Sequence, residues 1–577
     1  MRVPRLLLAL ALLGLTGLPA VAQERWRLQA PDEVAPLLRR FLPDPEVASE
    51  QPDRAARLFL ARRLRSEATD LLATEGYFTP ELNTDVDDGV VVLDVQPGRR
   101  TEVRSVEITF TGAIASDPAY AARMAALREA WALPAGRPFR QQDWTSAKER
   151  LLQELSAQDF AIASLRESVA DIDTEASAAH LRLTVDSGPP FLLGPLQIEG
   201  LDRYETDLVQ RYNPLRVGEP YSRERLLTLQ SALQNTAYFS AVEIDLQPGA
   251  DPAQPVPVRV RLTENKPRRG SLGVGYSSNT GARVEVGYRD ADLFNKAWQL
   301  NSGVRVEQRR QSAFADVYFP RGEEGQRYGV GGLINNEKIE GLQIFKQQIG
   351  AVRSRTRGNI DQTIGLSYQR EKSHPDGADE AVKTALALNW GWTHRKVDNL
   401  LDPRKGYVMQ VQIGGGAQVL LSDGNFLRNY GRLHGWWPLS PRDVLLGRVE
   451  GGYTIAKTRD FVPEDFLFRT GGSQTVRGYD YLSLGVKEGT ATVGGRYMAI
   501  GSVEYNHWFA PSWAGAVFMD AGNAADELEG FTVRYGYGLG ARWKSPAGNI
   551  AFDVAYGQGG GQDESGVKAH ISIAFAF

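Results

Sequence analysis

The chain has 577 residues, no cysteine, and a formal charge of −4 from 66 basic and 70 acidic residues. The length predicts three or four domains, and the lack of cysteine excludes disulfides, thiolate metal sites and a cysteine nucleophile. The slightly acidic balance gives no reason to expect nucleic-acid binding, which requires a basic surface. The mean hydropathy of −0.33 is typical of a soluble protein.

The first 22 residues have the three parts of a secretory signal peptide. Arg2 and Arg5 give a positive start, residues 6–18 form an apolar run, and Ala20-Val21-Ala22 is a small-x-small cleavage site before Gln23. The apolar run is too short to span about 30 Å of hydrocarbon. We therefore expect residues 1–22 to be removed from an exported protein, which is either secreted or enters a membrane as a β-barrel with a weak hydropathy signal.

Three similar segments follow, at residues 23–100, 101–188 and 189–266. Each has an amphipathic helical stretch that ends near an aromatic residue, and then a strand of alternating apolar residues that ends in a turn with proline. The corresponding phenylalanines are Phe78, Phe160 and Phe239. The order predicted for each copy is β-α-α-β-β, which is a plausible small α+β domain. The alternative is three unrelated α+β domains whose spacing agrees by chance.

From Gly270 onward, apolar and polar residues alternate with the period of two that is typical of β-strands. About sixteen strands are predicted in residues 267–577, an even number that suits a bacterial outer-membrane barrel. Eight of the 11 tryptophans lie in this half, several near strand ends, as an interfacial belt requires. A soluble β-sandwich also alternates and is the alternative.

The C-terminus favours the barrel. Residues 568–577 place apolar side chains at alternate positions, and the chain stops at Phe577. Such an edge strand would aggregate in a soluble protein, but it is stable when it pairs in a closed barrel with its apolar face in lipid. We therefore predict a 16-stranded antiparallel transmembrane β-barrel after three α+β repeats.

A long connection between the eleventh and twelfth predicted strands, residues 457–496, carries a distinctive motif. If the first strand rises from the periplasm, this connection is the sixth extracellular loop. It contains Val476-Arg477-Gly478-Tyr479, and Phe518-Met519-Asp520-Ala521-Gly522 follows two strands later. Strand parity places Glu504 and Asp520 on the lumen face, where a carboxylate can accept a bidentate pair from an arginine that folds inward. The alternative is an exposed loop arginine and an ordinary lumen acid.

Together, these motifs, the terminal phenylalanine and the upstream repeats resemble the superfamily of outer-membrane insertases and two-partner secretion transporters. The resemblance covers essentially all of the chain after the signal peptide. It implies periplasmic polypeptide-transport-associated (POTRA) domains and a barrel of sixteen strands in the outer membrane. We expect no cofactor. It also implies that Arg477 and Asp520 form a latch for the loop, with Tyr479 packed beside it and Glu504 as a further companion.

The number of repeats distinguishes branches of this superfamily. Assembly-machine insertases usually have five, and two-partner transporters have two with an N-terminal plug helix, for which a repeat starting near Gln23 leaves no room. Three repeats resemble the TamA branch, the outer-membrane subunits of translocation and assembly modules. This implies insertion of autotransporters and related outer-membrane proteins, contact with outer-membrane lipid, and a TamB-type partner anchored in the inner membrane. A transporter for one exoprotein and a passive porin-like channel remain alternatives.

The seam between the first and last strands is the expected working part. Gly270, Gly273 and Gly275 weaken the first strand, which must pair with the last strand, the strand that carries Phe575 and Phe577. A weak pair can open sideways and accept a client strand by β-augmentation. The alternative is that these glycines only relieve crowding inside the barrel.

We expect no enzyme and no metal site. The six histidines are scattered, and the sequence has neither a His-Glu-x-x-His motif nor a nucleophile elbow. Glu504 and Asp520 could be a hydrolase pair, but a latch for Arg477 needs no further assumption. Residues 399–406, between the eighth and ninth predicted strands, are interpreted as a turn and not as a site.

Overall fold

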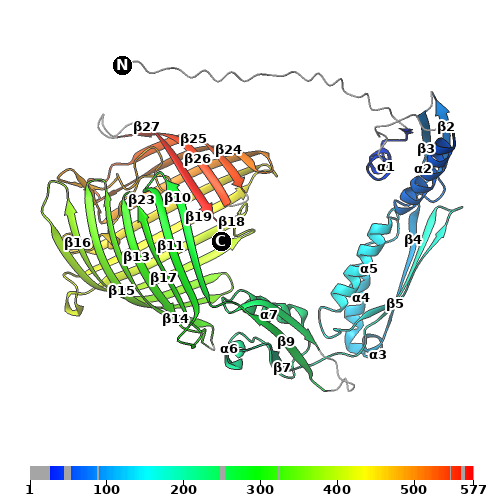
Figure 1. Cartoon of the computed structure of the whole chain (residues 1–577), viewed down its shortest axis with the longest axis horizontal. Coiled ribbons are helices and arrows are strands. Elements are labelled where there is room, and N and C mark those ends of the chain that lie inside the picture. The colour runs from blue at the N-terminus through cyan, green and yellow to red at the C-terminus, as the bar shows by residue number, and fades with distance from the viewer. Residues whose placement is uncertain are drawn as a thin grey trace, which may run out of the picture. The chain divides into compact units, whose positions relative to one another are not determined.

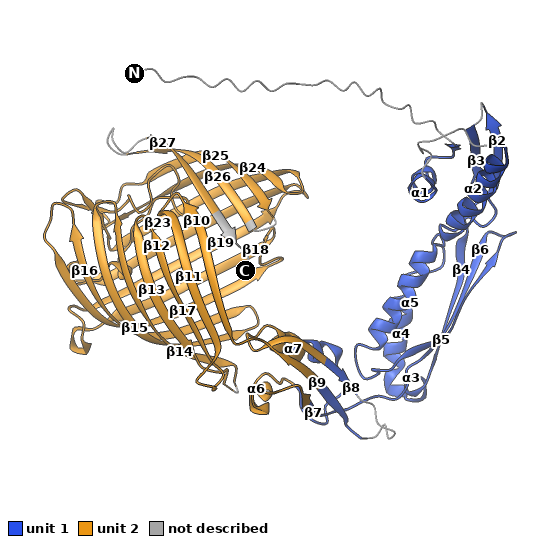
Figure 2. Cartoon of the chain, in the orientation of Figure 1, with its two compact units in different colours: residues 1–197, 215–228, 244–259 blue, residues 198–214, 229–243, 260–577 orange. Residues whose placement is uncertain are grey.

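The computed structural model describes residues 26–43, 54–87, 90–246, 254–322, 324–545, 548–559 and 566–575. The predicted signal peptide, residues 1–22, and the terminal Phe577 lie outside the described residues. The chain divides into two compact units (Figure 2). One holds residues 1–197, 215–228 and 244–259, and the other holds residues 198–214, 229–243 and 260–577.

The first segment is a three-stranded sheet with two helices. Its elements are β1 (Trp26–Gln29), α1 (Ala35–Phe41), α2 (Arg54–Thr74), β2 (Glu81–Asp87) and β3 (Val90–Gln96). The central strand β3 is parallel to β1 and antiparallel to β2. Leu64, Ala68 and Leu72 of α2 form one core with Val91 and Leu93 of β3, because helical spacing of four and strand spacing of two each gather apolar side chains on one face.

The second segment has the same topology. Its elements are β4 (Glu102–Thr111), α3 (Ala113–Ser116), the 3-10 turn η1 (Pro118–Tyr120), α4 (Ala121–Glu129), α5 (Gln141–Leu155), β5 (Ser164–Asp173) and β6 (Ala178–Asp186). The order across the sheet is β4-β6-β5. Trp144, Leu151 and Leu155 of α5 share a buried core with Leu181 and Leu183 of β6. The two short elements α3 and η1 are additions to the predicted order.

The third segment contains β7 (Leu193–Glu199), α6 (Thr206–Gln210), α7 (Arg223–Gln234), β8 (Phe239–Leu246) and β9 (Val256–Glu264). Its sheet order, β7-β9-β8, corresponds to that of the two preceding sheets. All three segments therefore place their last strand in the middle of the sheet, as one repeated β-α-α-β-β unit requires. None of the helices in the described ranges has a stretch long and apolar enough to span a bilayer.

Sixteen antiparallel strands form a single sheet that curls into a barrel (Figure 1). They are β10 (Arg268–Ser277), β11 (Gly281–Leu293), β12 (Trp298–Glu307), β13 (Arg310–Tyr318), β14 (Gln326–Ile339), β15 (Leu342–Arg357), β16 (Ile360–Pro375), β17 (Ala381–Val397), β18 (Gly406–Gly416), β19 (Phe426–Pro438), β20 (Asp443–Ala456), β23 (Tyr497–Ala510), β24 (Trp513–Ala525), β25 (Arg534–Ser545), β26 (Gly548–Gln558) and β27 (Gly566–Phe575). The predicted sixteen-stranded antiparallel barrel is confirmed. We call the end at which β10 begins the periplasmic end.

The strand register separates an apolar outer face from a polar inner face. Val284 and Val286 of β11 pair with Val306 and Val304 of β12, and all four side chains are exposed. Similar exposed apolar side chains recur on the same face from strand to strand around the sheet. A soluble protein rarely exposes apolar surface on this scale, whereas lipid requires it. The β-sandwich alternative is therefore wrong.

The two ends of the sheet, β10 and β27, are not joined by a backbone ladder within the described residues. In that part of the chain, β27 is bound instead by Ser278, the residue after β10, whose Oγ atom lies 3.4 Å from both the amide nitrogen and the carbonyl oxygen of Ile571. On β10, Leu272 and Val274 are 75% and 79% exposed. The predicted seam glycines Gly270, Gly273 and Gly275 lie on this open strand, and Phe575 is the last residue of β27.

One carboxylate holds the loop before α6 against the end of β9. The Oε1 atom of Glu264 accepts hydrogen bonds from the backbone N–H groups of Asp202 and Arg203 at 3.0 Å and of Tyr204 at 3.1 Å. Its Oε2 atom accepts one from Arg203 Nε at 2.9 Å. Burial opposes ionisation of this carboxyl, but the Arg203 guanidinium and the three N–H groups outweigh it and lower the pKa of Glu264.

We expect the Glu264→Gln variant to loosen this loop at pH 7 and to lose the acid sensitivity of the native protein. A carboxyl with a lowered folded pKa stabilises the fold above its unfolded pKa of about 4.3, and this contribution is lost as pH falls through the folded pKa. Amide-exchange protection factors of residues 202–204 should fall on the order of tenfold in the variant at pH 7, and in the native protein between pH 7 and pH 3. The exposed neighbour Glu205 provides the control, Glu205→Gln. Native protection at pH 7 in Glu264→Gln would contradict the prediction.

Candidate functional site

The long loop between β20 and β23, residues 457–496, packs against the inner wall of the barrel. It contains a small hairpin, β21 (Val486–Glu488) with β22 (Ala491–Val493). Val476 and Tyr479 are buried in an apolar cluster with two further loop residues and three wall residues: Phe468, Leu484, Met498, Ile500 and Ala524. The loop therefore has its own apolar core inside the lumen. This core fixes the position of Arg477, which lies between Val476 and Gly478.

Arg477 binds two carboxylates of the barrel wall, those of Asp520 and Glu504. Its Nε and Nη2 atoms donate to the two oxygens of Asp520 at 2.7 and 2.9 Å, and its backbone N–H donates to Asp520 Oδ2 at 3.0 Å. Its Nη1 atom donates to Glu504 Oε2 at 2.6 Å. The guanidinium carbon lies 3.4 Å from the centre of the Phe518 ring. The bidentate pair and the ring below fix the plane of the guanidinium.

A second arginine and a third acid extend this network to the next two strands. Arg542 of β25 donates to Glu504 at 3.0 and 2.7 Å and to Asp553 of β26 at 2.6 Å. Arg477 Nη1 lies 3.5 Å from Asp553 Oδ2, and Ser502 Oγ donates to Asp520 Oδ1 at 2.6 Å. Each of the three carboxylates thus has a guanidinium partner, which offsets the cost of burying it. Removing one partner of a buried ion pair generally costs about 3–5 kcal/mol.

Glycines allow the loop backbone to approach the wall closely. Gly478 has a φ of 94°, and a Cβ atom there would overlap the backbone of Tyr556 and Gly557 in β26. A Cβ atom on Gly536 of β25 would overlap the carbonyl oxygen of Arg477. The loop side of this contact therefore needs the left-handed conformation that glycine adopts without strain, and the wall side needs a position without a side chain.

The loop is also tied to the last strand of the sheet. The N–H group of Gly478 donates to Nε2 of the buried His570 at 3.0 Å, and Lys568 forms an ion pair with Asp480 at 2.8 Å. Both His570 and Lys568 lie on β27, the strand at the seam. The network around Arg477 therefore includes one side chain from each of five consecutive strands: Glu504, Asp520, Arg542, Asp553 and His570.

The structure places the predicted site residues as follows. Arg477, Glu504, Phe518 and Asp520 meet directly, and Glu504 binds Arg477 as closely as Asp520 does. Gly522 does not take part in the charge network, because its position serves strand packing: a Cβ atom there would overlap the backbone of the neighbouring strand β23.

Arg542, Asp553 and His570 were not predicted as site residues. The signal that could have found them is strand parity, because Asp553 pairs in register with both Gly540 and His570 on the lumen face. In the described residues, no group of three or more His, Asp or Glu side chains is arranged to hold a metal ion.

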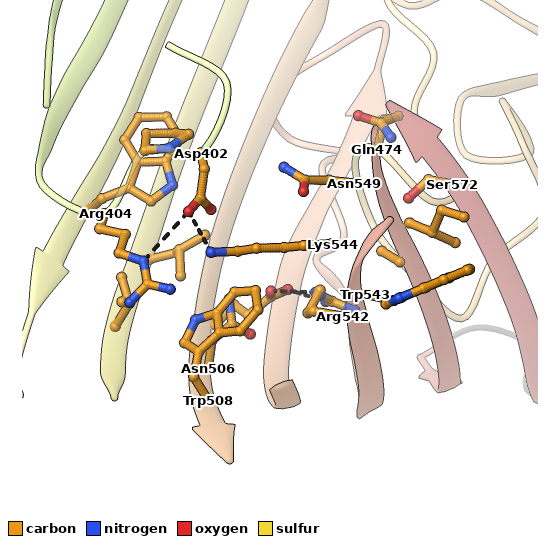
Figure 3. Close-up of a pocket in the computed structure, with 17 residues that line it drawn as sticks. Asp402, Arg404, Gln474, Asn506, Trp508, Arg542, Trp543, Lys544, Asn549 and Ser572 are labelled. Carbon is orange, nitrogen blue, oxygen red and sulfur yellow. Dashed lines mark hydrogen bonds and ion pairs between the residues drawn. The ribbon is translucent and has the colours of Figure 1, made fainter. Parts of the chain in front are cut away.

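The connection between β17 and β18, residues 398–405, reaches into the lumen. Asp402 forms an ion pair with Lys544 at the end of β25, and the carbonyl of Leu401 accepts a hydrogen bond from Asn549 at 3.0 Å. Figure 3 shows Asp402 between Arg404 and Lys544. The backbone of this segment turns as the sequence predicts, and Asp402 and the carbonyl of Leu401 also connect it to β25 and β26 near the seam.

This connection lines a cavity of about 260 Å³, to which Gln474 of the long loop also contributes. Arg404 and Lys544 both lie against the ring of Trp508, 5.0 and 3.9 Å from a ring centre. The wall of the cavity also includes Glu504 and Arg542. The charge network around Arg477 and the 398–405 connection therefore face one another across a single small space inside the barrel.

An apolar-faced barrel of sixteen strands, a long loop held inside it by a buried arginine, and small α+β segments before the first strand define a class of protein. They are the features of a bacterial outer-membrane barrel with POTRA-type domains. The Omp85 superfamily domain matches residues 266–575, more than half of the chain, and the protein belongs to the Omp85 superfamily. A POTRA domain, described as a surface antigen variable number repeat, matches residues 192–265.

Two curated relatives are outer membrane protein assembly factors. The outer membrane protein assembly factor BamA of Nitratidesulfovibrio vulgaris is 26% identical over 382 residues, which cover 62% of this chain and 47% of the relative. BamA of Neisseria meningitidis serogroup B is 22% identical over 572 residues, 85% of this chain and 69% of the relative. The protein thus spans about half the length of the first of these relatives.

A solved structure shares the fold. BamA from Haemophilus ducreyi lacking POTRA domains 1–3 has a TM-score of 0.64 and 17% identity to this chain, and the match covers 82% of this chain and 100% of that one.

We expect the Gly536→Ala variant to displace the long loop while the barrel stays folded. The added methyl group would overlap the carbonyl oxygen of Arg477, and a backbone atom can move away only if the loop moves. Overpacking of this kind costs about 1–3 kcal/mol, so proteolysis of residues 457–496 should accelerate on the order of tenfold. Heat-dependent gel mobility would report the folded barrel.

Gly501→Ala is the matched control, because a Cβ atom at this position of β23 has no neighbour within 4 Å. Equal loop cleavage in the two variants would show that the contact between Gly536 and Arg477 does not hold the loop.

Proposed function

We propose that this protein inserts other outer-membrane proteins into the membrane by accepting a client strand at the seam between β10 and β27. The observation that carries the proposal is the unpaired seam. β15 and β16 pair along the full length of 16-residue strands, whereas β10 and β27 share no backbone ladder in the described residues. Opening the sheet there breaks the fewest hydrogen bonds, and it exposes N–H and C=O groups that can pair with an incoming strand.

The charge network gives the two sides of the seam different stiffness. On one side, β23 to β27 are cross-linked through Arg477, Arg542 and the long loop. On the other side, β10 is exposed on both faces over most of its length. We infer that β27 and its neighbours act as the fixed template and that β10 is the strand that moves. In this scheme, the role of the Arg477 latch is to keep the template strands in register while a client pairs.

We further propose that the protein belongs to the TamA branch, with autotransporters and related outer-membrane proteins as clients and a TamB-type partner. Three successive segments with one topology support this assignment. The lumen also holds the long loop and the 398–405 connection, which a passive porin-like channel would not need. A transporter for one dedicated exoprotein is the competing assignment that an experiment should separate.

Locking the seam with a disulfide should abolish most of the assembly activity. The protein has no native cysteine, so the pair Ser278→Cys and Ile571→Cys can be placed where β10 and β27 touch. In vesicles, the oxidised variant should insert little of a client barrel, and reductant should restore insertion. The control pair, Leu272→Cys with Val286→Cys, joins register partners on β10 and β11 and should stay active when oxidised. A locked seam with native activity would contradict lateral opening.

Partner capture by the full-length protein should identify the branch. Crosslinking in cells, followed by purification of this chain, is expected to recover a large TamB-type protein anchored in the inner membrane together with several unfolded barrel clients. Recovery of one secreted exoprotein without such a partner would assign the chain to the two-partner transporters. A large, steady conductance with neither kind of partner would assign it to channels.

A further inference from the structure

A second cavity, of about 520 Å³, lies at the periplasmic end of the barrel. One wall is formed by Tyr212 and by residues 232–238 at the end of α7. The other wall is formed by the turn after β13 and by the last residues of β15. Both walls belong to the same compact unit, and the hydroxyl of Tyr238 donates a hydrogen bond to the carbonyl of Ala297 at 2.8 Å. The first wall is therefore held to the rim of the barrel by direct contact.

Three arginines line this cavity: Arg321, Arg327 and Arg355. Among the described residues, one of these three arginines forms an ion pair: Arg355 lies 3.7 Å from the exposed carboxylate of Glu324. The Arg321 guanidinium also lies 5.8 Å from the ring centre of Tyr212. The site therefore concentrates positive charge with little compensating negative charge.

One buried donor at the cavity, Nε of Arg355, has no hydrogen-bond partner within the described residues. A buried donor without a partner costs free energy unless a ligand or water satisfies it. Burial raises the pKa of the nearby Tyr212 phenol, and the charges that oppose this rise are Arg327, Arg321 and Arg211. The cavity thus offers hydrogen-bond donors and a positive potential to an anion.

The position of the cavity matches the level of lipid headgroups. Trp298 makes an edge contact with Phe319 at 4.8 Å, and Phe294 lies 6.3 Å from Trp298. Such aromatic clusters mark the interface between membrane and water. The strand register places Arg353 beside Tyr328 on the outer face of β15.

Because side chains alternate along a strand, Arg355 and Arg357 lie on the same face as Arg353. These three arginines of β15 form a basic stripe, which runs from the cavity onto the surface that contacts lipid.

We propose that this cavity binds the phosphate of an anionic phospholipid of the periplasmic leaflet, with Arg321 and Arg355 as the main donors. The planar guanidinium group donates two parallel hydrogen bonds to phosphate oxygens. The stripe of arginines on β15 lets the phosphate enter from the lipid side while the acyl chains stay in the bilayer. The bound lipid would join residues 232–238 to the barrel rim, and so it would hold the end of the third segment at the membrane surface. This inference does not depend on the proposed assembly activity.

Lipid retention by the full-length protein tests the proposal. The double variant Arg321→Gln with Arg355→Gln is compared with the native chain in detergent micelles, and bound lipid is counted by native mass spectrometry. Phosphatidylglycerol should bind the native protein more tightly than phosphatidylethanolamine, and the double variant should bind phosphatidylglycerol about tenfold more weakly. The control is Arg442→Gln, an exposed arginine of the turn between β19 and β20, which should bind like the native protein.

Two outcomes would overturn the proposal. One is equal phosphatidylglycerol binding by the double variant and by Arg442→Gln in protein whose gel mobility shows a folded barrel. The other is displacement of the lipid by millimolar inorganic phosphate, with phosphate alone retained by the native protein, which would assign the cavity to a free phosphate. If the double variant does not fold, the single variant Arg355→Gln is measured in its place, with intermediate retention expected.

Discussion

The buried guanidinium of Arg477 requires compensating negative charge inside the barrel, and carboxylates on the neighbouring wall strands supply it. Asp520 supplies a bidentate acceptor and Glu504 a second one. Because Asp553 adds a third carboxylate, a second cation is needed, and Arg542 bridges Glu504 and Asp553. The result links consecutive strands side chain to side chain, in addition to their backbone ladders. Through these contacts, the long loop is fixed to the inner wall of the barrel.

This cross-linking ends at the seam, and there the sheet changes character. His570 on β27 holds the backbone of Gly478, so the last strand is coupled to the long loop. β10 contributes glycines and exposed side chains instead. A membrane barrel needs every backbone polar group satisfied within the bilayer, and so a seam without a ladder must find other partners. An incoming strand would supply the same hydrogen bonds as closure, which is the physical basis of the strand acceptance proposed above.

The strands and the repeats could be predicted because their signals are local. A period of two over ten or more residues specifies a strand and its two faces, and the parity that placed Glu504 and Asp520 in the lumen agrees with the register. The site was predicted less completely. Arg542, Asp553 and His570 lie on strands with the same parity signal, but nothing local distinguishes a lumen acid that binds Arg477 from one that binds water. The 398–405 connection has turn chemistry, and its contact with Lys544 joins residues more than a hundred positions apart.

By itself, therefore, the sequence determined the architecture: three β-α-α-β-β segments and sixteen strands with an apolar outer face, which follow from short-range periodicity. It also identified the loop motif and its main acceptors through resemblance. Only the tertiary structure decided which lumen charges compensate one another, that the loop reaches β27, and that arginines from one turn and two strands line one cavity at the rim. Closing a sheet brings residues from distant strands together, and their charges then balance in three dimensions in a way that spacing along the chain does not encode.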